Sequence, residues 1–449
     1  MNIDPTIFRS YDIRGIYPSQ INRDIAYKIA QAYCKFVNPQ KVVLGRDVRT
    51  SGPELFEAMK QGLLDHGVDV ADIGVVSTDM MYFAVANYDY DGGLTVTASH
   101  NPKEYNGCKI VRKGGKPISS DSGIFDIRDI VLNGYKFKSE AKAKLTQLDT
   151  KQDYIDKILS FIDIGSIKPF KLLANTNFGT AGAALRLLEK KLPLELTVLN
   201  EEPNGEFPKG RPDPLIPSNR DEIITALQAG TFDLGVMWDS DADRVFFLDE
   251  TGRFLSGYFT SAVLAEYFLQ KYPKSKVIVD MKLNWAIIDT VKRAGGIALG
   301  NKTGHSYFKE RMIAEQAVFG GEISGHYFFK DFFYLDNGMI PLVIILEILS
   351  RTGQKLSQIY QPYFDKYFAI DETNVPVKDI AKTIEFLKGK YVDAKQSFID
   401  GISLEYPNWR ANVRLAANEP LIRLNVEAKD PETLKQKTQE LLKLIRTRF

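Results

Sequence analysis

The sequence is poor in cysteine, and it has no apolar run long enough to cross a membrane. Cys34 and Cys108 are the only cysteines in 449 residues, too few for a disulfide framework, which favours a reducing compartment and predicts a cytoplasmic location. The most apolar stretch, residues 339–349, is too short for a membrane span and contains a proline and a glutamate, so it predicts a buried helix. Residues 1–5 have neither a basic nor an apolar region of the kind found in signal peptides.

The sequence also lacks an excess of either charge. It has 58 basic and 57 acidic side chains and a net charge of +1, which argues against a nucleic-acid partner or an anionic membrane surface. Any basic site must therefore be local. Hydrophobic residues make up 44% and charged residues 26%, ordinary values for a globular protein, and the length predicts three or four domains.

Helical and strand-like patterns alternate along the first 100 residues, which predicts an α/β fold. The expected elements are a helix over 23–37, a strand over 41–45, a helix over 53–66, and strands over 68–73 and 93–97. A Lys- and Thr-rich segment at 136–151 indicates the first domain boundary.

The rest of the chain divides on the same grounds. Strands are expected over 171–174, 232–238 and 245–248, a helix over 181–190, and a loop with five prolines over 203–217. Another α/β unit follows, and then a segment of different texture, with strand-like pieces at 401–406, 411–415 and 421–428 before a Lys-rich helix. The domains predicted from these changes cover residues 1–145, 150–253, 254–365 and 366–449.

An acidic triplet stands out between two of the apolar runs. Asp239, Asp241 and Asp243 are followed by Arg244, either at a strand end or in a tight loop between two strands. If the segment is extended, side chains at i, i+2 and i+4 point the same way, so the three carboxylates can converge on one ion. Hard oxygen ligands suit Mg²⁺. The simpler alternative is an acidic surface turn, but the apolar flanks disfavour full solvation.

A serine that can carry a phosphate precedes the triplet by 140 positions. Ser99 lies in the sequence Thr-Ala-Ser-His-Asn-Pro, whose Asn-Pro turn predicts an exposed loop. Lys109 follows ten residues later and can neutralise phosphate, and Arg244 can contact a transferring phosphate through its planar fork. By itself a Ser-His pair is usually structural. Together with a metal site it makes phosphoryl transfer the first hypothesis.

Three of the four histidines, His100, His305 and His326, are predicted to lie in glycine-containing loops, which favours roles in a site. Residues 302–305 can place an acid or base beside a sugar hydroxyl. Residues 320–326, Gly-Gly-Glu-Ile-Ser-Gly-His, offer a carboxylate, a hydroxyl and an imidazole on one loop. Each loop taken separately is compatible with a simple turn.

These loops, in this order, resemble those of the α-D-phosphohexomutase superfamily, most closely the bacterial phosphomannomutase/phosphoglucomutase branch. The resemblance covers essentially the whole chain and rests on residues 8–15 (Phe-Arg-Ser-Tyr-Asp-Ile-Arg-Gly), 97–102, 239–244 and 321–326. It implies three similar mixed α/β domains and a C-terminal α+β domain of the TATA-binding-protein-like type around a central cleft. The first three would carry the phosphoserine, metal and sugar loops, and the fourth a phosphate-binding loop.

The resemblance also implies the roles of individual residues. Ser99 would be the phosphoserine, and it would bind one Mg²⁺ per chain together with Asp239, Asp241 and Asp243. The residues expected around the reacting groups are Arg14, Lys109, Arg244, Lys282 and His305. Those expected to bind the substrate are Tyr11, His100, Glu322, Ser324, His326, Arg414, Asn418 and Arg423.

The C-terminal phosphate loop departs from the family pattern Arg-x-Ser-Asn-Thr-Glu-Pro. Here residues 414–420 are Arg-Leu-Ala-Ala-Asn-Glu-Pro, so two side-chain donors are missing and Asn418 replaces a threonine. Hydrogen bonds to a charged phosphate contribute roughly 1.5 to 3 kcal/mol each, so their loss would weaken binding about 10²- to 10⁴-fold without compensation. The metal loop departs less, at Ser240 and Ala242.

The leading hypothesis is a phosphomannomutase that interconverts mannose 6-phosphate and mannose 1-phosphate for nucleotide-sugar synthesis. Its phosphoserine would act through a hexose 1,6-bisphosphate, which also serves as activator. The alternatives are phosphoglucomutase or dual activity, a metal-dependent phosphatase, and a sugar-phosphate-binding protein with an impaired phosphate loop. A monomer or weak homodimer is expected.

Overall fold

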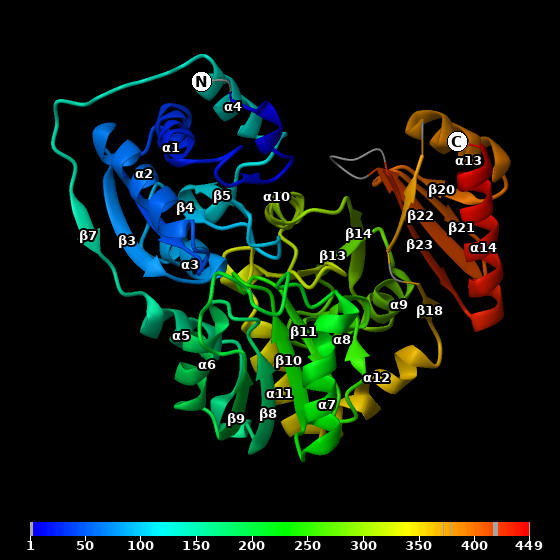
Figure 1. Cartoon of the computed structure of the whole chain (residues 1–449). Coiled ribbons are helices and arrows are strands. Elements are labelled where there is room, and N and C mark those ends of the chain that lie inside the picture. Colours follow the sequence, from blue (N-terminus) through cyan, green and yellow to red (C-terminus); the bar gives the residue numbers. More distant parts are fainter. Residues whose placement is uncertain (1–2, 371, 378, 416–420, 449) are drawn as a thin grey trace. The chain divides into compact units, whose positions relative to one another are not determined.

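The computed structural model describes residues 3–370, 372–377, 379–415 and 421–448. The chain, whose elements are labelled in Figure 1, divides into two compact units. Each unit combines segments that are distant in the sequence. The first unit consists of Met1–Leu255 with Ser324–Leu356, and the second of Ser256–Ile323 with Ser357–Phe449. Among the described residues, no helix is both long and apolar enough to span a bilayer.

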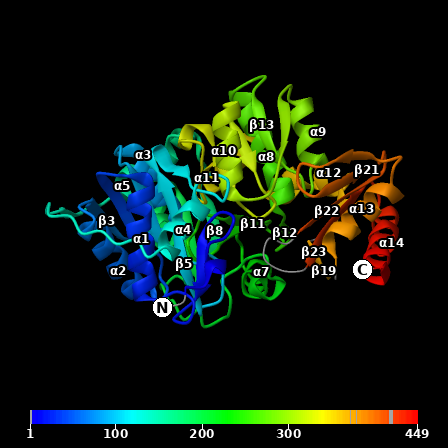
Figure 2. The same ribbon diagram turned by 90° about the horizontal axis from the view of Figure 1, so that it is seen from above.

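The first sheet of unit 1 has seven strands in the order β1-β5-β4-β2-β3-β7, with β6 paired to β5. Its strands are β1 (Ile13–Ile16), β2 (Lys41–Arg46), β3 (Asp69–Val75), β4 (Gly92–Val96), β5 (Tyr105–Arg112), β6 (Lys116–Pro117) and β7 (Leu145–Gln147). The predicted helices are present as α1 (Arg23–Val37) and α2 (Gly52–Asp65), and they share one apolar core with α4 (Ile124–Leu132). In Figure 2, α1 and α2 lie side by side.

Strand β4 is parallel to β2 and antiparallel to β5, so the sheet is mixed. Helix α3 (Thr78–Asn87), which the sequence did not predict, connects β3 back to β4. The connection from β2 through α2 to β3 and the connection from β3 through α3 to β4 run in opposite directions along the sheet. Because such crossovers are right-handed, α2 and α3 lie on opposite faces of the sheet. The carboxyl ends of β2 and β4 therefore open onto the loops at residues 47–51 and 97–104.

The second sheet of unit 1 has the order β12-β11-β10-β8-β9. Its strands are β8 (Phe170–Asn175), β9 (Leu194–Leu199), β10 (Leu234–Trp238), β11 (Val245–Leu248) and β12 (Phe254–Leu255), and its helices are α5 (Lys151–Leu159), α6 (Ala181–Glu189) and α7 (Asp221–Ala229). Unit 1 also contains the antiparallel pair β16 (Tyr327–Phe329) and β17 (Leu335–Asp336) and helix α11 (Ile340–Thr352). The prediction of a buried helix over residues 339–349 is confirmed by α11, whose apolar side chains are almost all buried.

Unit 2 begins with a parallel arrangement in which β13 pairs with both β14 and β15. The elements are α8 (Gly257–Lys271), β13 (Lys276–Asp280), α9 (Trp285–Arg293), β14 (Ile297–Asn301), α10 (His305–Glu315), β15 (Phe319–Gly321) and α12 (Leu356–Phe364). The loops after β13, β14 and β15 follow the carboxyl ends of parallel strands, and so they meet at one edge of the sheet.

The C-terminal sheet is antiparallel, with the order β18-β23-β22-β21-β20 and with β19 paired to β23. Its elements are β18 (Phe368–Ala369), β19 (Thr373–Pro376), α13 (Ile380–Lys390), β20 (Lys395–Ser397), β21 (Ile402–Glu405), β22 (Trp409–Leu415), β23 (Leu421–Ala428) and α14 (Pro431–Arg448). Both views show α13 and α14 on the same side of this sheet, where their side chains share one apolar core with β22 and β23 (Figures 1 and 2).

Candidate active site

The predicted site residues fall into two groups, one in each unit. In unit 1 the group centres on Ser99, in the loop after β4. The Ser99 hydroxyl is buried, donates a hydrogen bond to Asp239 Oδ2 at 2.7 Å, and lies 3.1 Å from His100 Nδ1. Ser99 was predicted to lie on an exposed loop, but it is buried, because Asp239 and Ser240 contact it, and residues 100–102 of the loop are half-buried. The backbone of Ser99 has a φ of 48°, a left-handed conformation that a serine adopts only when its surroundings hold it there.

Arg49 holds the serine loop in this conformation. Its guanidinium is buried and donates hydrogen bonds to four main-chain carbonyls of the loop and the strand that follows it. The acceptors are the oxygens of Ser99 (2.6 Å), Asn101 (2.6 Å), Pro102 (2.7 Å) and Tyr105 (2.9 Å). The carbonyls of Ser99 and Pro102 also accept hydrogen bonds from the Ser240 hydroxyl (2.7 Å) and the Tyr105 N–H (3.1 Å). Arg49 joins all four carbonyls through one side chain.

Asp47 completes the support from the same segment. It forms a buried ion pair with the Arg49 guanidinium at 3.2 Å and accepts hydrogen bonds from the Arg49 backbone N–H at 2.9 Å and from the Thr97 hydroxyl at 2.7 Å. The Thr97 oxygen in turn accepts a hydrogen bond from the Ser99 backbone N–H at 2.8 Å. Neither Asp47 nor Arg49 was predicted from the sequence, although an Asp-x-Arg sequence directly after a buried strand was a signal that could have identified them.

The acidic triplet forms a tight loop between the antiparallel strands β10 and β11, one of the two predicted alternatives. The carboxylates converge because the chain turns, with Ala242 at a φ of 56°, and not because the segment is extended. One oxygen from each of Asp239, Asp241 and Asp243 lies within 4.8 Å of the others, and all three residues are fully buried.

Lys109, on β5, supplies a cation to the triplet. Its ammonium lies 2.8 Å from Asp241 Oδ2 and contacts Asp243 Oδ2 directly. Burial lowers the pKa of Lys109, but Asp241 and Asp243 outweigh this effect, so its pKa is raised and the ammonium stays protonated. Burial raises the pKa of Asp239, and the two neighbouring carboxylates raise it further.

The donor set fits a divalent cation. Three carboxylates face one ammonium and the Arg244 guanidinium, which lies 3.8 Å from Asp239, and this leaves an excess of negative charge. Asp241 Oδ1 is buried and accepts no hydrogen bond from the described part of the chain. Oxygen ligands with excess negative charge are what Mg²⁺ requires.

Thr78, at the start of α3, orients one of these carboxylates. Its hydroxyl donates to Asp241 Oδ2 at 2.6 Å, and its backbone N–H donates to the Asp241 carbonyl at 2.9 Å. No local pattern in the sequence indicated Thr78, because the contact joins positions 163 residues apart.

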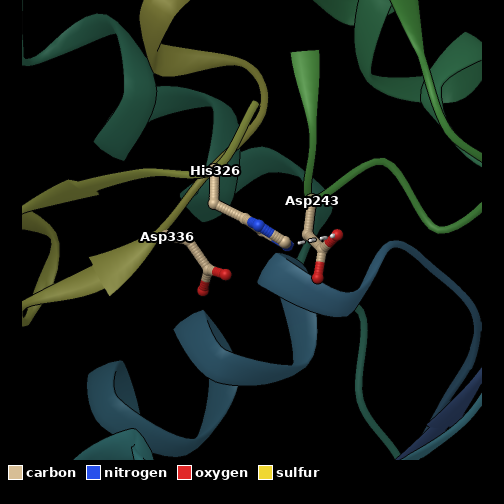
Figure 3. Close-up of side chains that lie close together, drawn as sticks. All are labelled: Asp243, His326 and Asp336. Atoms are coloured by element: carbon tan, nitrogen blue, oxygen red, sulfur yellow. Dashed lines mark ion pairs between the residues drawn. The ribbon is translucent and has the colours of Figure 1, made fainter. Parts of the chain in front are cut away.

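His326 and Arg244 lie on the other side of Asp243. Figure 3 shows the imidazole of His326 pointing toward Asp243, with Asp336 of β17 beside it. The ring Nε2 lies 3.4 Å from Asp243 Oδ1 and accepts a hydrogen bond from Arg244 Nε at 3.3 Å, while Ser324 Oγ lies 3.3 Å from Nδ1. Part of the predicted sugar loop thus contacts the metal loop directly.

Arg14 contacts the serine loop, and His100 is part of it. Arg14, on β1, pairs with Asp12 and donates to the Asn101 side chain at 2.6 Å, and Tyr11 lies in the bend just before β1. Burial lowers the pKa of His100 well below its usual range, and Arg244 and Arg14 lower it further, so its imidazole is neutral.

Two of the predicted residues of unit 2, Lys282 and Glu322, lie near Asp280 at the end of β13. Its carboxylate pairs with Lys282 Nζ at 3.2 Å and accepts hydrogen bonds from the Thr303 hydroxyl (3.3 Å) and the Ile323 N–H (3.2 Å). Glu322 accepts from the Gly304 N–H at 2.8 Å. Three loops are thereby fixed to one another, and Asp280 was not predicted as a site residue.

His305 was predicted to lie in a loop, and this is wrong: it is the first residue of α10. The glycine before it has a φ of 130° and starts the helix, so the loop ends one residue earlier than expected. His305 is buried, with Lys309 Nζ 3.5 Å from its Nδ1.

The C-terminal pair of arginines is held by one carboxylate. Arg414 and Arg423 are cross-strand partners in β22 and β23, and they contact the two oxygens of Glu372 at 2.5 and 3.0 Å. Asn418 and the rest of the substituted loop, residues 416–420, lie outside the described residues.

Family models match four successive parts of the chain. They describe the α/β/α domains I, II and III and the C-terminal domain of phosphoglucomutase/phosphomannomutase, at residues 5–138, 152–252, 256–367 and 372–444. The four-domain architecture expected from the resemblance is confirmed by these matches.

Similar proteins span the full length. Phosphohexose mutases of Xanthomonas campestris pv. campestris are 41% identical over 98% of this chain and 99% of theirs, and a phosphomannomutase of Vibrio cholerae is 41% identical over 98% of both. The crystal structure of a phosphoglucomutase/phosphomannomutase family protein from Burkholderia thailandensis is 31% identical, with a TM-score of 0.90 over 100% of this chain and 99% of that one. The chain therefore belongs to the phosphoglucomutase/phosphomannomutase family and is a phosphohexomutase, an intramolecular phosphotransferase of the isomerase class.

Proposed function

We propose that this phosphohexomutase interconverts mannose 6-phosphate and mannose 1-phosphate through a phosphorylated Ser99. One observation carries the proposal: the Ser99 hydroxyl is buried 2.7 Å from a carboxylate of an acidic triplet whose other two members hold Lys109. A phosphate on Ser99 would meet a cation site and an ammonium at the same place.

Each half of the proposed reaction exchanges one P–O bond for another. The bond from phosphorus to Ser99 Oγ breaks as a bond forms to the free hydroxyl oxygen of the sugar phosphate, which becomes a 1,6-bisphosphate. The hydroxyl proton leaves the sugar at the same time, and we assign its acceptor to His305. In the second half the other phosphate returns to Ser99, and the sugar oxygen left behind regains a proton.

Lys109 acts in this proposal as a fixed charge and not as an acid. Its raised pKa, caused by Asp241 and Asp243, keeps the ammonium protonated over the working pH range. Arg244 and Arg14 add guanidinium donors on either side of the serine loop. Together they would stabilise the charge that spreads over the phosphoryl oxygens during transfer.

The sugar phosphate is bound by the remaining predicted residues. We propose that Glu322, Ser324 and His326 bind the sugar hydroxyls. Tyr11 and His100 would bind the part of the substrate nearest Ser99. The phosphate at the far end of the substrate would be bound by Lys282, Arg414 and Arg423. Asn418 is proposed as a further phosphate ligand. Two guanidiniums on neighbouring strands can bind a phosphate at either end of a bisphosphate, which the two halves of the reaction require.

Mg²⁺ is the proposed cofactor, with a catalytic amount of hexose 1,6-bisphosphate as activator. Asp239, Asp241, Asp243 and the phosphorylated Ser99 would hold the ion, which when bound supplies charge neutralisation for the phosphate. The bisphosphate would load Ser99 with phosphate before the first turnover.

The experiment that tests the proposal is turnover of mannose 1-phosphate by the purified protein with Mg²⁺ and hexose 1,6-bisphosphate. Glucose 1-phosphate, a free-phosphate assay, Ser99→Ala and the exposed serine control Ser160→Ala accompany it. Isomerisation lost in S99A and kept in S160A is expected. Release of free phosphate without isomerisation would instead show a phosphatase.

Glucose phosphates are the second candidate substrates, because the matching family models name both activities. Mannose and glucose differ only at the C2 hydroxyl, so the ratio of the two kcat/KM values ranks them. If neither sugar is isomerised while mass spectrometry shows Ser99 phosphorylated, a sugar-phosphate-binding role with an impaired 414–420 loop replaces the proposal.

A further inference from the structure

A buried ion pair lies on the hairpin that carries the phosphate-binding arginines. Arg410 of β22 and Glu427 of β23 are cross-strand partners, with Nη1 and Oε1 3.2 Å apart and both residues almost fully buried. Replacing a buried ion pair with apolar residues is often neutral or even stabilising, so stability alone is a weak explanation for it. Its other contacts show what it holds.

Arg410 and Glu427 form hydrogen bonds with the backbone on both sides of Lys282, and these hydrogen bonds together are called the grip below. The Arg410 fork donates to the carbonyls of Met281 and Lys282, the latter at 2.9 Å. Glu427 accepts from the N–H groups of Asn284 at 3.0 Å and Trp285 at 3.3 Å. Lys282 therefore lies on a loop whose main chain is fixed by side chains of the C-terminal domain.

The same contacts cap helix α9. Its own N-cap residue, Asn284, makes no side-chain hydrogen bond to the first turn. Glu427 accepts from the first N–H groups, and the Tyr258 hydroxyl, which also contacts Glu427, accepts from the Ala286 N–H at 2.8 Å. A carboxylate at a helix N-terminus satisfies unpaired donors and interacts favourably with the helix dipole.

One row of side chains along the hairpin of β22 and β23 leads from Arg410 and Glu427 to Arg414 and Arg423. Alternate positions face one way along a strand, so one face of the hairpin carries three cross-strand polar pairs. They are Arg410 with Glu427, Asn412 with Asn425, and Arg414 with Arg423. Four residues of extended chain separate the ends of the row, a span of about 13 Å.

We propose that Arg410 and Glu427 are positioning residues that keep Lys282 in a fixed place relative to Arg414 and Arg423. A substrate phosphate gripped by the arginines then meets Lys282 at a set distance, although they belong to different domains. The inference rests on the proposed function, in which all three cations bind the substrate. Arg410 and Glu427 touch no substrate and act through the loop backbone.

The test is a double-mutant cycle with Lys282. The Arg410→Met/Glu427→Leu variant removes the grip and leaves no unpaired buried charge, and Lys282→Met removes the group that the grip positions. Each change alone is expected to raise KM for mannose 1-phosphate about 10- to 100-fold, the range for one charge-assisted hydrogen bond, with a smaller fall in kcat. In the K282M background, R410M/E427L is expected to change KM less than threefold.

Additive effects would overturn the inference, because a merely structural role of the pair would raise KM equally with or without Lys282. An unchanged KM in R410M/E427L would overturn it as well. Arg410→Lys, which keeps the charge but loses the fork, enters the same cycle if the double variant does not fold, and Arg446→Met on the exposed side of α14 is the matched arginine control. An inactive wild-type protein would refute the proposed function instead, so the two failures are distinguishable.

Discussion

Arg49→Lys should disturb the conformation of the serine loop while leaving Ser99 and the charged groups around it in place. The guanidinium donates to four loop carbonyls at 2.6–2.9 Å, and a single ammonium cannot reach all four. Losing two hydrogen bonds from a charged donor, at roughly 1.5 to 3 kcal/mol each, destabilises the loop by about 3 to 6 kcal/mol. That energy corresponds to a population of the native loop reduced about 100-fold or more.

We therefore expect R49K to lower kcat about 100-fold while KM changes little, because the proposed ligands of the sugar hydroxyls, Glu322, Ser324 and His326, lie outside the serine loop. The assays are the initial rate of isomerisation and the phosphate occupancy of Ser99, measured by mass spectrometry after incubation with glucose 1,6-bisphosphate. Arg128→Lys, at a half-exposed position of α4, controls for the loss of a guanidinium. An R49K enzyme with kcat and Ser99 occupancy within twofold of wild type would refute the reasoning.

Two further predictions concern the metal loop and its surroundings. Thr78→Val removes the hydroxyl that orients Asp241, so the Mg²⁺ concentration for half-maximal activity should rise about 10-fold, as is typical for a lost outer-shell partner. Thr78→Ser keeps the hydroxyl and should leave this concentration unchanged. A Mg²⁺ titration that shows no change in T78V would contradict the role of Thr78. Burial raises the pKa of Asp79 from 3.8 to about 7, so the folded state holds a proton that the unfolded state releases, and stability falls as pH rises between these values. Asp79→Asn should remove that dependence, worth about 4 kcal/mol between pH 3 and pH 8. Urea unfolding of the wild-type protein and D79N across this pH range measures the dependence. A difference in their free energies of unfolding that stays constant with pH would show that the pKa of Asp79 is not raised in the folded state.

The acidic triplet illustrates what the sequence could predict about the site. Its spacing and apolar flanks indicated converging carboxylates in a loop between two strands, and Asp239, Asp241 and Asp243 do converge there. The reason was different from the one expected, since a left-handed residue at Ala242 turns the chain. A local pattern was enough because all three ligands come from five consecutive residues.

Thr78, Asp280 and Arg49 could not be predicted in the same way. Their roles depend on contacts with residues 43 to 163 positions away, which exist only after the sheets have formed. His305 shows the opposite limit, because it was placed in a glycine-containing loop, whereas the loop ends at Gly304 and His305 is the first residue of helix α10. The alternation of polar and apolar residues over 409–415 and 422–428 was visible in the sequence, but only the pairing register shows which polar residues face one another.

The cap on helix α9 has a consequence for biosynthesis. Glu427 follows Trp285 by 142 residues, so the ribosome makes the helix long before it makes the residue that completes the first turn. Domains generally fold in order as they emerge, yet the domain that contains α9 must wait for β23, the last strand of the described chain. A chain truncated before β23 would lose not only its last domain but also the finished form of the loop that presents Lys282.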